Sequence, residues 1–284
     1  MNDRHVGIAI VGGGPVGAAL LLALRESGYS LALLEARPSM SARDPRALAL
    51  AHGTRLILER LDAWSGLAAR ATAIETIHVS QRGGFGRALM TAREAAVPAL
   101  GYTAEYGDLY AALAERVGAG APEVVLGAQV MAVRPAAGCG LVEYTREGKS
   151  ATLSARLIVL ADGGKSLPAP RVSVKDYGQS AVICTVRSEL PHAHRAYERF
   201  TPKGPIALLP LGDDYALVWT TRNELLEARM ALADTDFLAQ LHDAFGDRQG
   251  RFLRAGPRST FPLRLITSEP DARAGLVRIG NAAQ

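Results

Sequence analysis

Residues 6–17 read VGIAIVGGGPVG, an apolar run that meets three glycines and then a proline. A continuous run of apolar residues is typical of a strand that is buried on both faces of a parallel sheet. Residues 15–27 are apolar on most faces and are followed by Gly28, which predicts a helix and its end. A second short strand is predicted over 30–34, so the chain opens with a βαβ unit.

The glycines occupy the positions of the dinucleotide-binding fingerprint, in which a glycine turn joins a strand to a helix. Gly12 allows the tight turn, Gly14 lets the backbone approach a pyrophosphate, and Gly17 lets the helix pack close to the strand. Glu35 ends the second strand, where a carboxylate accepts a hydrogen bond from a ribose hydroxyl and favours FAD or NAD over NADP. The alternative is a glycine turn that binds nothing, and the strand, helix and acidic partner together argue against it.

The apolar pattern changes character after residue 167. Before it, strands alternate with helices; after it, strands are separated by turn residues, which predicts an antiparallel sheet with one exposed face. We therefore expect an α/β fold with a Rossmann-like FAD-binding domain built from 1–167 and 271–284, and a β-rich antiparallel substrate domain over 168–270. The patterns predict strands over 123–126, 130–133, 141–145, 151–154, 156–161, 181–187, 206–211, 215–221, 252–265 and 276–279, and helices over 109–117, 223–230 and 236–245.

Composition excludes several classes of protein. The net charge is +4, and the basic residues are scattered rather than clustered with aromatic residues, so we expect no nucleic-acid partner. Cys139 and Cys184 form no CxxC pair and the histidines have no ligand spacing, so we expect no metal and reduced thiols. The longest apolar stretch, 16–24, is too short to span a bilayer, and no secretory signal is visible. These features predict a cytoplasmic protein.

Two further segments each follow a predicted strand. Asp162-Gly163 ends the strand over 156–161, and Gly280-Asn281 ends the strand over 276–279. Either one alone is a common turn. With the glycine fingerprint before them, in this order, they resemble the flavoprotein aromatic hydroxylase family. The resemblance implies that the fingerprint binds the ADP half of FAD, that Asp162-Gly163 lies near the pyrophosphate and the nicotinamide cosubstrate, and that Gly280-Asn281 contacts the ribityl and ribose region.

Other segments narrow the resemblance. DPRALAL at 44–50 resembles a family segment whose arginine lies against the flavin, which implies this role for Arg46. The ubiquinone-biosynthesis hydroxylases resemble this chain at LGY (100–102), DYGQ (176–179), AYERFT (196–201), GPIALLPL (204–211) and LVW (217–219). GNAAQ at 280–284 departs from the family's Gly-Asp-Ala-Ala-His in a way typical of the UbiH-like branch, which acts on 2-polyprenyl-6-methoxyphenol.

The resemblance implies a monooxygenase with FAD as cofactor, NADPH as cosubstrate, and O2 and a polyprenyl phenol as substrates. It implies no catalytic side chain, because the cofactor carries the chemistry and the protein binds and orients. Pro210 and Trp219 are candidates for the wall of the ring pocket, and a place in the core of the sheet is the alternative for Trp219. The cofactor-binding residues expected are Gly12, Gly13, Gly14, Pro15, Val16, Gly17, Glu35, Ala36, Arg37, Arg46, Asp162, Gly163, Gly280 and Asn281.

A polyprenyl tail needs an apolar channel or delivery from a membrane surface, so peripheral contact with the inner membrane is expected, as is a ubiquinone-biosynthesis complex. Because the family continues beyond the position of Gln284, this chain is expected to be a C-terminally truncated member. The alternatives are a sibling hydroxylase with other regiochemistry, an NAD-dependent oxidoreductase, and a degenerate flavoprotein that serves as a component of a complex.

Overall fold

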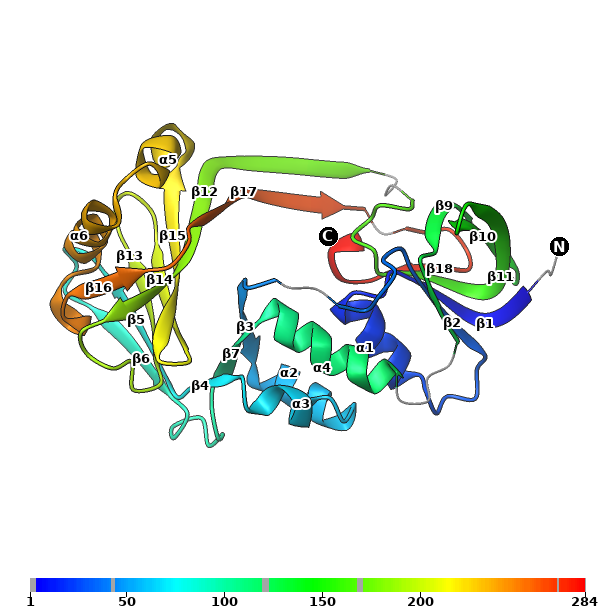
Figure 1. Cartoon of the computed structure of the whole chain (residues 1–284), viewed down its shortest axis with the longest axis horizontal. Helices are drawn as coiled ribbons and strands as arrows, with labels where there is room; N and C mark the ends of the chain where they lie inside the picture. Colours follow the sequence, from blue (N-terminus) through cyan, green and yellow to red (C-terminus); the bar gives the residue numbers. More distant parts are fainter. Residues whose placement is uncertain (1–3, 42–43, 119–122, 168–170, 270, 284) are drawn as a thin grey trace.

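The computed structural model describes residues 4–41, 44–118, 123–167, 171–269 and 271–283. Figure 1 shows two sheet regions side by side, joined along one edge by the long strands β12 (Val172–Ser188) and β17 (Ser259–Ser268). The chain begins in the first region, enters the second region twice, and ends in the first. The first region therefore consists of segments that are far apart in the sequence.

The first sheet is built around parallel strands, because these strands are apolar on both faces. β1 (Arg4–Val11) pairs in parallel with β2 (Leu31–Glu35) and with β11 (Lys149–Leu160). The sheet is extended by strands that pair with these, parallel for β8 (Glu123–Leu126) and β18 (Leu276–Arg278) and antiparallel for β10 (Gly140–Arg146) and β9 (Gln129–Arg134).

Alternate residues of β1 enter two different cores. Ile8 and Ile10 pack with α1 (Pro15–Ala23) and α4 (Tyr106–Gly118), whereas Ala9 and Val11 face the core beneath β9 and β10. Beside α4 lie two helices and a small sheet: α2 (His52–Arg60), α3 (Trp64–Ala68), β3 (Ala47–Ala51), β7 (Gly101–Glu105) and β4 (Thr72–Ile74).

The second sheet is covered by helices on one face only. α5 (Asn223–Met230) and α6 (Asp234–Phe245) lie on its outer side, and η1 (Asp247–Gln249) follows them. Phe237, Leu241 and Phe245 of α6 pack on the sheet to form the third core. The order of its strands is β16 (Phe252–Ala255), β12, β15 (Asp214–Arg222), β14 (Ile206–Leu211), β13 (Arg195–Phe200), β5 (Thr76–Gln81) and β6 (Arg87–Thr91), with β17 paired to β12.

The predicted fold class is confirmed: a Rossmann-like α/β region is followed by a β-rich, mainly antiparallel one. Two details differ from the sequence prediction. β5 and β6 come from the first part of the chain but belong to the second sheet, and β5 pairs with β13 in parallel. The domain boundaries remain a prediction, and residues 168, 270 and Gln284 lie outside the described residues. None of the helices in the described ranges is long and apolar enough to cross a membrane.

Candidate functional site

The glycine turn after β1 is fixed by close backbone contacts. Gly12 donates its N–H to the carbonyl oxygen of Leu34 at 2.8 Å and has a φ of +102°, a conformation that favours glycine. A Cβ at Gly12 would lie 2.8 Å from the carbonyl oxygen of Ala161, and a Cβ at Gly17 would overlap the carbonyl oxygen of Gly12. Packing therefore excludes side chains at both positions.

The N-terminus of α1 has the properties of an anion site. Gly14 is its N-cap and Pro15 its first residue, so no side chain caps the helix, and its first turn contains no acidic residue. A Cβ at Gly14 would meet only the hydroxyl of Tyr106, at 4.0 Å, so the space in front of the turn is open. The first N–H groups of a helix lack intrahelical acceptors and carry positive potential. These residues fit the pyrophosphate of a dinucleotide.

Glu35 is a buried carboxylate whose acceptor positions are all engaged. Its Oε2 accepts the Gly13 N–H at 2.7 Å and Arg37 Nη2 at 3.3 Å, and its Oε1 accepts the backbone N–H of Arg37 at 2.9 Å and its Nε at 2.8 Å. Burial raises the pKa of this carboxyl, but the hydrogen bonds from Arg37 and Gly13 outweigh burial, so the pKa lies below its usual value. A carboxylate offers about four acceptor sites, so a ribose hydroxyl would replace a bond from Arg37.

Arg37 is held by a second partner. Its Nη2 donates to the hydroxyl of Tyr110 at 2.8 Å, and its guanidinium carbon lies 4.7 Å from the centre of that ring. Tyr110 is fully buried, and burial raises its pKa to about 12. Ala36, between Glu35 and Arg37, is exposed. Tyr110 was not anticipated from the sequence, because it reads there only as one apolar position of a helix.

The carboxylate of Asp162 stabilises the turn that follows it by accepting hydrogen bonds within that turn. Its Oδ1 accepts the N–H of Gly164 at 3.0 Å, and its Oδ2 accepts the N–H of Ser166 at 2.7 Å and the Ser166 hydroxyl. Gly163 has a φ of +74°. The Cα of Asp162 lies 2.8 Å from the position of a Cβ at Gly12, so this turn contacts the glycine turn directly. The carboxylate shapes the backbone here, and direct contact with a cofactor stays a prediction.

The last segment reaches the same place. Ile279 donates its N–H to Leu160 at the end of β11, and a 3₁₀ turn, η2 (Gly280–Ala282), follows. A Cβ at Gly280 would lie 3.1 Å from Val16 Cγ2, while the side chain of Asn281 is exposed. The structure thus brings the segments around Gly12, Asp162 and Gly280 together at the carboxyl edge of the parallel strands, where open α/β sheets bind ligands.

Arg46 lies between the two sheet regions. It forms a bidentate ion pair with Asp44, in which Nη2 lies 2.5 Å from Oδ2, and the hydrogen bonds to Asp44 raise the pKa of Arg46. Its guanidinium carbon lies 5.2 Å from the ring centre of Tyr106 and 5.3 Å from that of Phe261 on β17. Because the hydroxyl of Tyr106 borders Gly14, Arg46 lies next to the glycine turn and also touches the second sheet.

Pro210 and Trp219 lie elsewhere. Both are buried, and Trp219, 3% exposed, packs against Phe237 of α6 with the guanidinium of Arg229 at 3.7 Å from its ring. Pro210 alternates with Leu208 and Ile206, which belong to the same core. The side chains of both residues therefore face the helix-covered core of the second sheet, which is the alternative for Trp219, and a role for either residue in a ring pocket stays a prediction.

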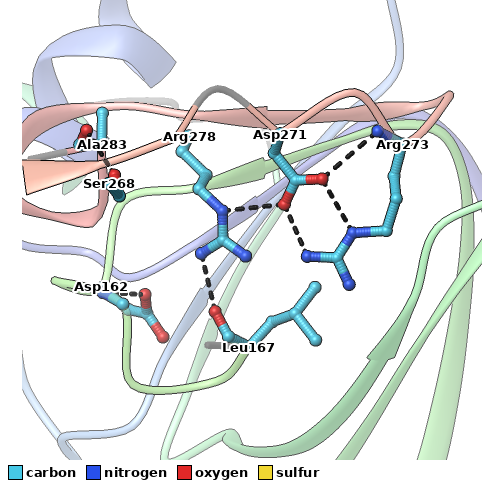
Figure 2. Close-up of polar contacts among 8 residues, drawn as sticks. Asp162, Leu167, Ser268, Asp271, Arg273, Arg278 and Ala283 are labelled. Carbon is cyan, nitrogen blue, oxygen red and sulfur yellow. Dashed lines mark hydrogen bonds and ion pairs between the residues drawn. The ribbon is translucent and has the colours of Figure 1, made fainter. Parts of the chain in front are cut away.

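A buried ionic cluster ties the segments of the first region together (Figure 2). Asp271 accepts hydrogen bonds from Arg273 Nε at 2.8 Å and from Arg278 Nε at 2.9 Å, and Arg278 Nη1 donates to the Leu167 carbonyl at 2.6 Å. The side chains of Asp271 and Arg278 are 3% and 4% exposed. Bonds from Arg273 and Arg278 hold the pKa of Asp271 far below its usual value. The sequence alone does not reveal this cluster, because its members are scattered charges along the chain.

Known proteins are similar over the whole chain. A family model described as FAD binding domain matches residues 5–283. Ubiquinone hydroxylase UbiL of Rhodospirillum rubrum is 32% identical over 99% of this chain and 67% of that protein. The 3-demethoxyubiquinol 3-hydroxylase of Escherichia coli is 28% identical over 100% of this chain and 74% of that protein.

A solved structure shares the fold. The p-nitrophenol 4-monooxygenase PnpA of Pseudomonas putida DLL-E4 aligns with a TM-score of 0.76 at 18% identity, over 99% of this chain and 73% of that one. The predicted FAD cofactor and flavin-dependent monooxygenase class are confirmed by the family match and the relatives. The glycine turn, its carboxylate partner and the two turns beside it are therefore the site of a chain that belongs to the FAD binding domain family.

Proposed function

We propose that this chain binds FAD at the glycine turn and hydroxylates the ring of a polyprenyl phenol in ubiquinone biosynthesis, with NADPH and O2 as cosubstrates. The observation that carries the proposal is the meeting of the Gly12, Asp162 and Gly280 segments beside an uncapped helix N-terminus, with Arg46 between this edge and the second sheet. The names of the relatives support the pathway, and the 2-polyprenyl-6-methoxyphenol branch remains part of the proposal.

Each part of the site has a separate task. The first N–H groups of α1 bind the pyrophosphate, and Glu35 binds the ribose after Arg37 releases one of its bonds. Arg46, held in place by Asp44, supplies positive charge beside the flavin. Gly280 permits the close approach of Asn281 to the ribityl chain. FAD, when bound and reduced, supplies the oxygen-transfer chemistry, so the protein has to orient the ring and exclude water.

The substrate's tail decides where the protein acts. A polyprenyl chain is apolar, so it has to reach the site through an apolar channel or from a bilayer surface. Peripheral contact with the inner membrane on the cytoplasmic side, and membership of a ubiquinone-biosynthesis complex, are parts of this proposal. Exposed apolar residues on the ribbon of β12 and β17, among them Val172, Val174 and Ile266, support an apolar contact surface.

The first measurement tests whether the protein retains FAD. The protein is incubated with excess FAD and desalted, and its absorbance spectrum is recorded; we expect retained flavin bands. The loaded protein is then mixed with NADPH and a prenylated methoxyphenol in air, and we expect NADPH oxidation and a product heavier by one oxygen atom. Retention of NAD in a parallel incubation, without retention of FAD, would support the NAD-dependent oxidoreductase. Retention of FAD without NADPH oxidation would support a degenerate flavoprotein.

A further inference from the structure

One carboxylate lies in the middle of an apolar row of the second sheet. The strand register places Ile183, Val218, Ala207, Glu198 and Val79 side by side on five neighbouring strands. Side chains that are paired across strands in this way point to the same face of the sheet. Glu198 is therefore an acidic residue among aliphatic neighbours.

The row lies on the face that α6 does not cover. Tyr197 and Leu208 face α6. Glu198 directly follows Tyr197 and Ala207 directly precedes Leu208, so both point to the opposite side of the sheet. The two faces also differ in burial: Tyr197 and Leu208 are buried, whereas Glu198 and Ala207 are half-buried. We call the face that carries this row the open face.

The open face meets the cofactor edge of the molecule. Ala181, two residues before Ile183 and thus on the same face, pairs with Phe261, whose ring lies 5.3 Å from the guanidinium carbon of Arg46. Four strand intervals separate β17 from β13, about 19 Å at roughly 4.8 Å each, so Glu198 lies about this far along the open face from Phe261. Glu198 thus lies on the surface that a ring substrate would contact.

Glu198 has no protein partner within the described residues. No hydrogen bond or ion pair to its carboxylate occurs there, and its pKa is raised by burial alone, without any contribution from a neighbouring charge. A half-buried carboxylate without a partner costs stability that an aliphatic residue at this position would not. A ligand hydroxyl that donates to it would offset this cost.

We propose that Glu198 recognises the ring hydroxyl of the phenolic substrate, its carboxylate accepting the hydrogen bond of the phenol O–H while the aliphatic neighbours in its row pack on the ring. The inference rests on the proposed function and assigns the substrate's polar contact to one side chain. It makes Glu198 a binding residue that selects phenols over their ethers.

The test compares two probes that differ only in this hydroxyl, 2-methoxy-6-prenylphenol and its O-methyl ether. Binding of each to the FAD-loaded protein is followed by the change in the flavin spectrum, without turnover. The unchanged protein is expected to bind the phenol more tightly by about tenfold or more, the contribution of a hydrogen bond to a charged group. In Glu198→Val, which matches Val79 and Val218, the ratio is expected to fall to near one, and in Glu198→Gln to an intermediate value.

Glu224→Gln, on the exposed side of α5, is the matched control and should leave the ratio unchanged. Retained FAD and a melting temperature no lower than that of the unchanged protein show that a variant is folded, and the isosteric Gln variant covers the case in which Val is not tolerated. An equal preference for the phenol in all variants would overturn the role of Glu198 and leave the proposed function standing. Failure of the unchanged protein to hold FAD would instead overturn the proposed function.

Discussion

The first sheet presents backbone groups to its ligand edge, whereas the second sheet presents side chains from one of its two faces. At the first edge, Gly12, Gly14 and Gly17 act through the absence of side chains, and the binding groups are N–H donors. On the second sheet, neighbouring residues of one strand have opposite roles: Tyr197 packs under α6 while Glu198 faces away. Function at the first edge thus depends on the spacing of glycines. On the second sheet it depends on which of two alternating residues in a strand faces away from α6.

The role of the glycine spacing at the first edge is tested most strongly by Gly17→Val. Its side chain would overlap the carbonyl of Gly12, so we expect a loss of more than about 4 kcal/mol in the free energy of unfolding and no retained FAD. Denaturant unfolding and the flavin spectrum measure both. Gly53→Ala is the control, because Gly53 lies in α2 with open space around it, and we expect it to raise stability by about 0.5–1 kcal/mol. Equal effects of the two changes would contradict the packing role of Gly17.

The buried ionic cluster that ties the segments of the first region together is tested by Asp271→Ala. This change leaves Arg278 buried without its carboxylate, and we expect it to lower the free energy of unfolding by about 3–5 kcal/mol at pH 7. Glu143→Ala, which breaks the exposed pair with Arg134, should cost no more than about 1 kcal/mol. The depressed pKa of Asp271 means that its stabilisation is fully present above its unfolded value of about 3.9 and is lost as the pH falls toward the folded value. The difference in the free energy of unfolding between the unchanged protein and Asp271→Ala, measured from unfolding curves, should therefore narrow as the pH falls from 7 to 2.

Two adjacent residues of β15 test which face of the second sheet contacts the substrate. Trp219→Ala removes a ring packed on Phe237, so we expect a loss of about 3–5 kcal/mol. Val218→Ala, on the open face, should cost only about 1 kcal/mol and weaken the binding of the prenylated phenol several-fold. Thermal unfolding and the flavin-spectrum titration separate these effects. A binding defect in a folded Trp219 variant with no defect in the Val218 variant would reverse the assignment of the faces.

The smallest effect is expected for Glu35→Gln. The amide keeps the shape of the carboxylate but loses its charge-assisted bonds with Arg37, so FAD should bind about tenfold more weakly. Equilibrium titration with FAD measures this change. Glu26→Gln, an exposed residue beyond α1, is the control and should leave the affinity as it is. An unchanged affinity in the Glu35 variant would show that the ribose is bound by other groups.

Several elements of both regions could be predicted well from the sequence because their signals are local. A glycine triplet between an apolar strand and an apolar helix has few other interpretations, and the predicted strands over 123–126 and 206–211 and the helix over 223–230 match β8, β14 and α5 in full. Each of these elements is bounded by turn or charged residues that the chain itself displays.

The parts that could not be predicted depend on contacts between distant segments. The parallel pairing of β5 with β13 joins residues far apart in sequence, so no local pattern announces it. The sequence does not show which way Pro210 and Trp219 face because both faces of β14 are apolar: Ala207 and Leu209 alternate with Ile206 and Leu208, and only the position of α6 distinguishes the faces. For the same reason Glu198 was noted only as part of a resembling segment.

The ribbon of β12 and β17 connects the two regions through an irregularity at Tyr177-Gly178 (Figure 1). Before it Asp176 pairs with Arg264, and after it Gln179 pairs with Leu263; Gly178 has a φ of +64°, and its N–H is bonded to Asp176. A bulge concentrates bending and twist at one point of an otherwise regular ladder. The change of direction between the two regions is therefore concentrated at Tyr177-Gly178, and the ladder is regular on either side of it.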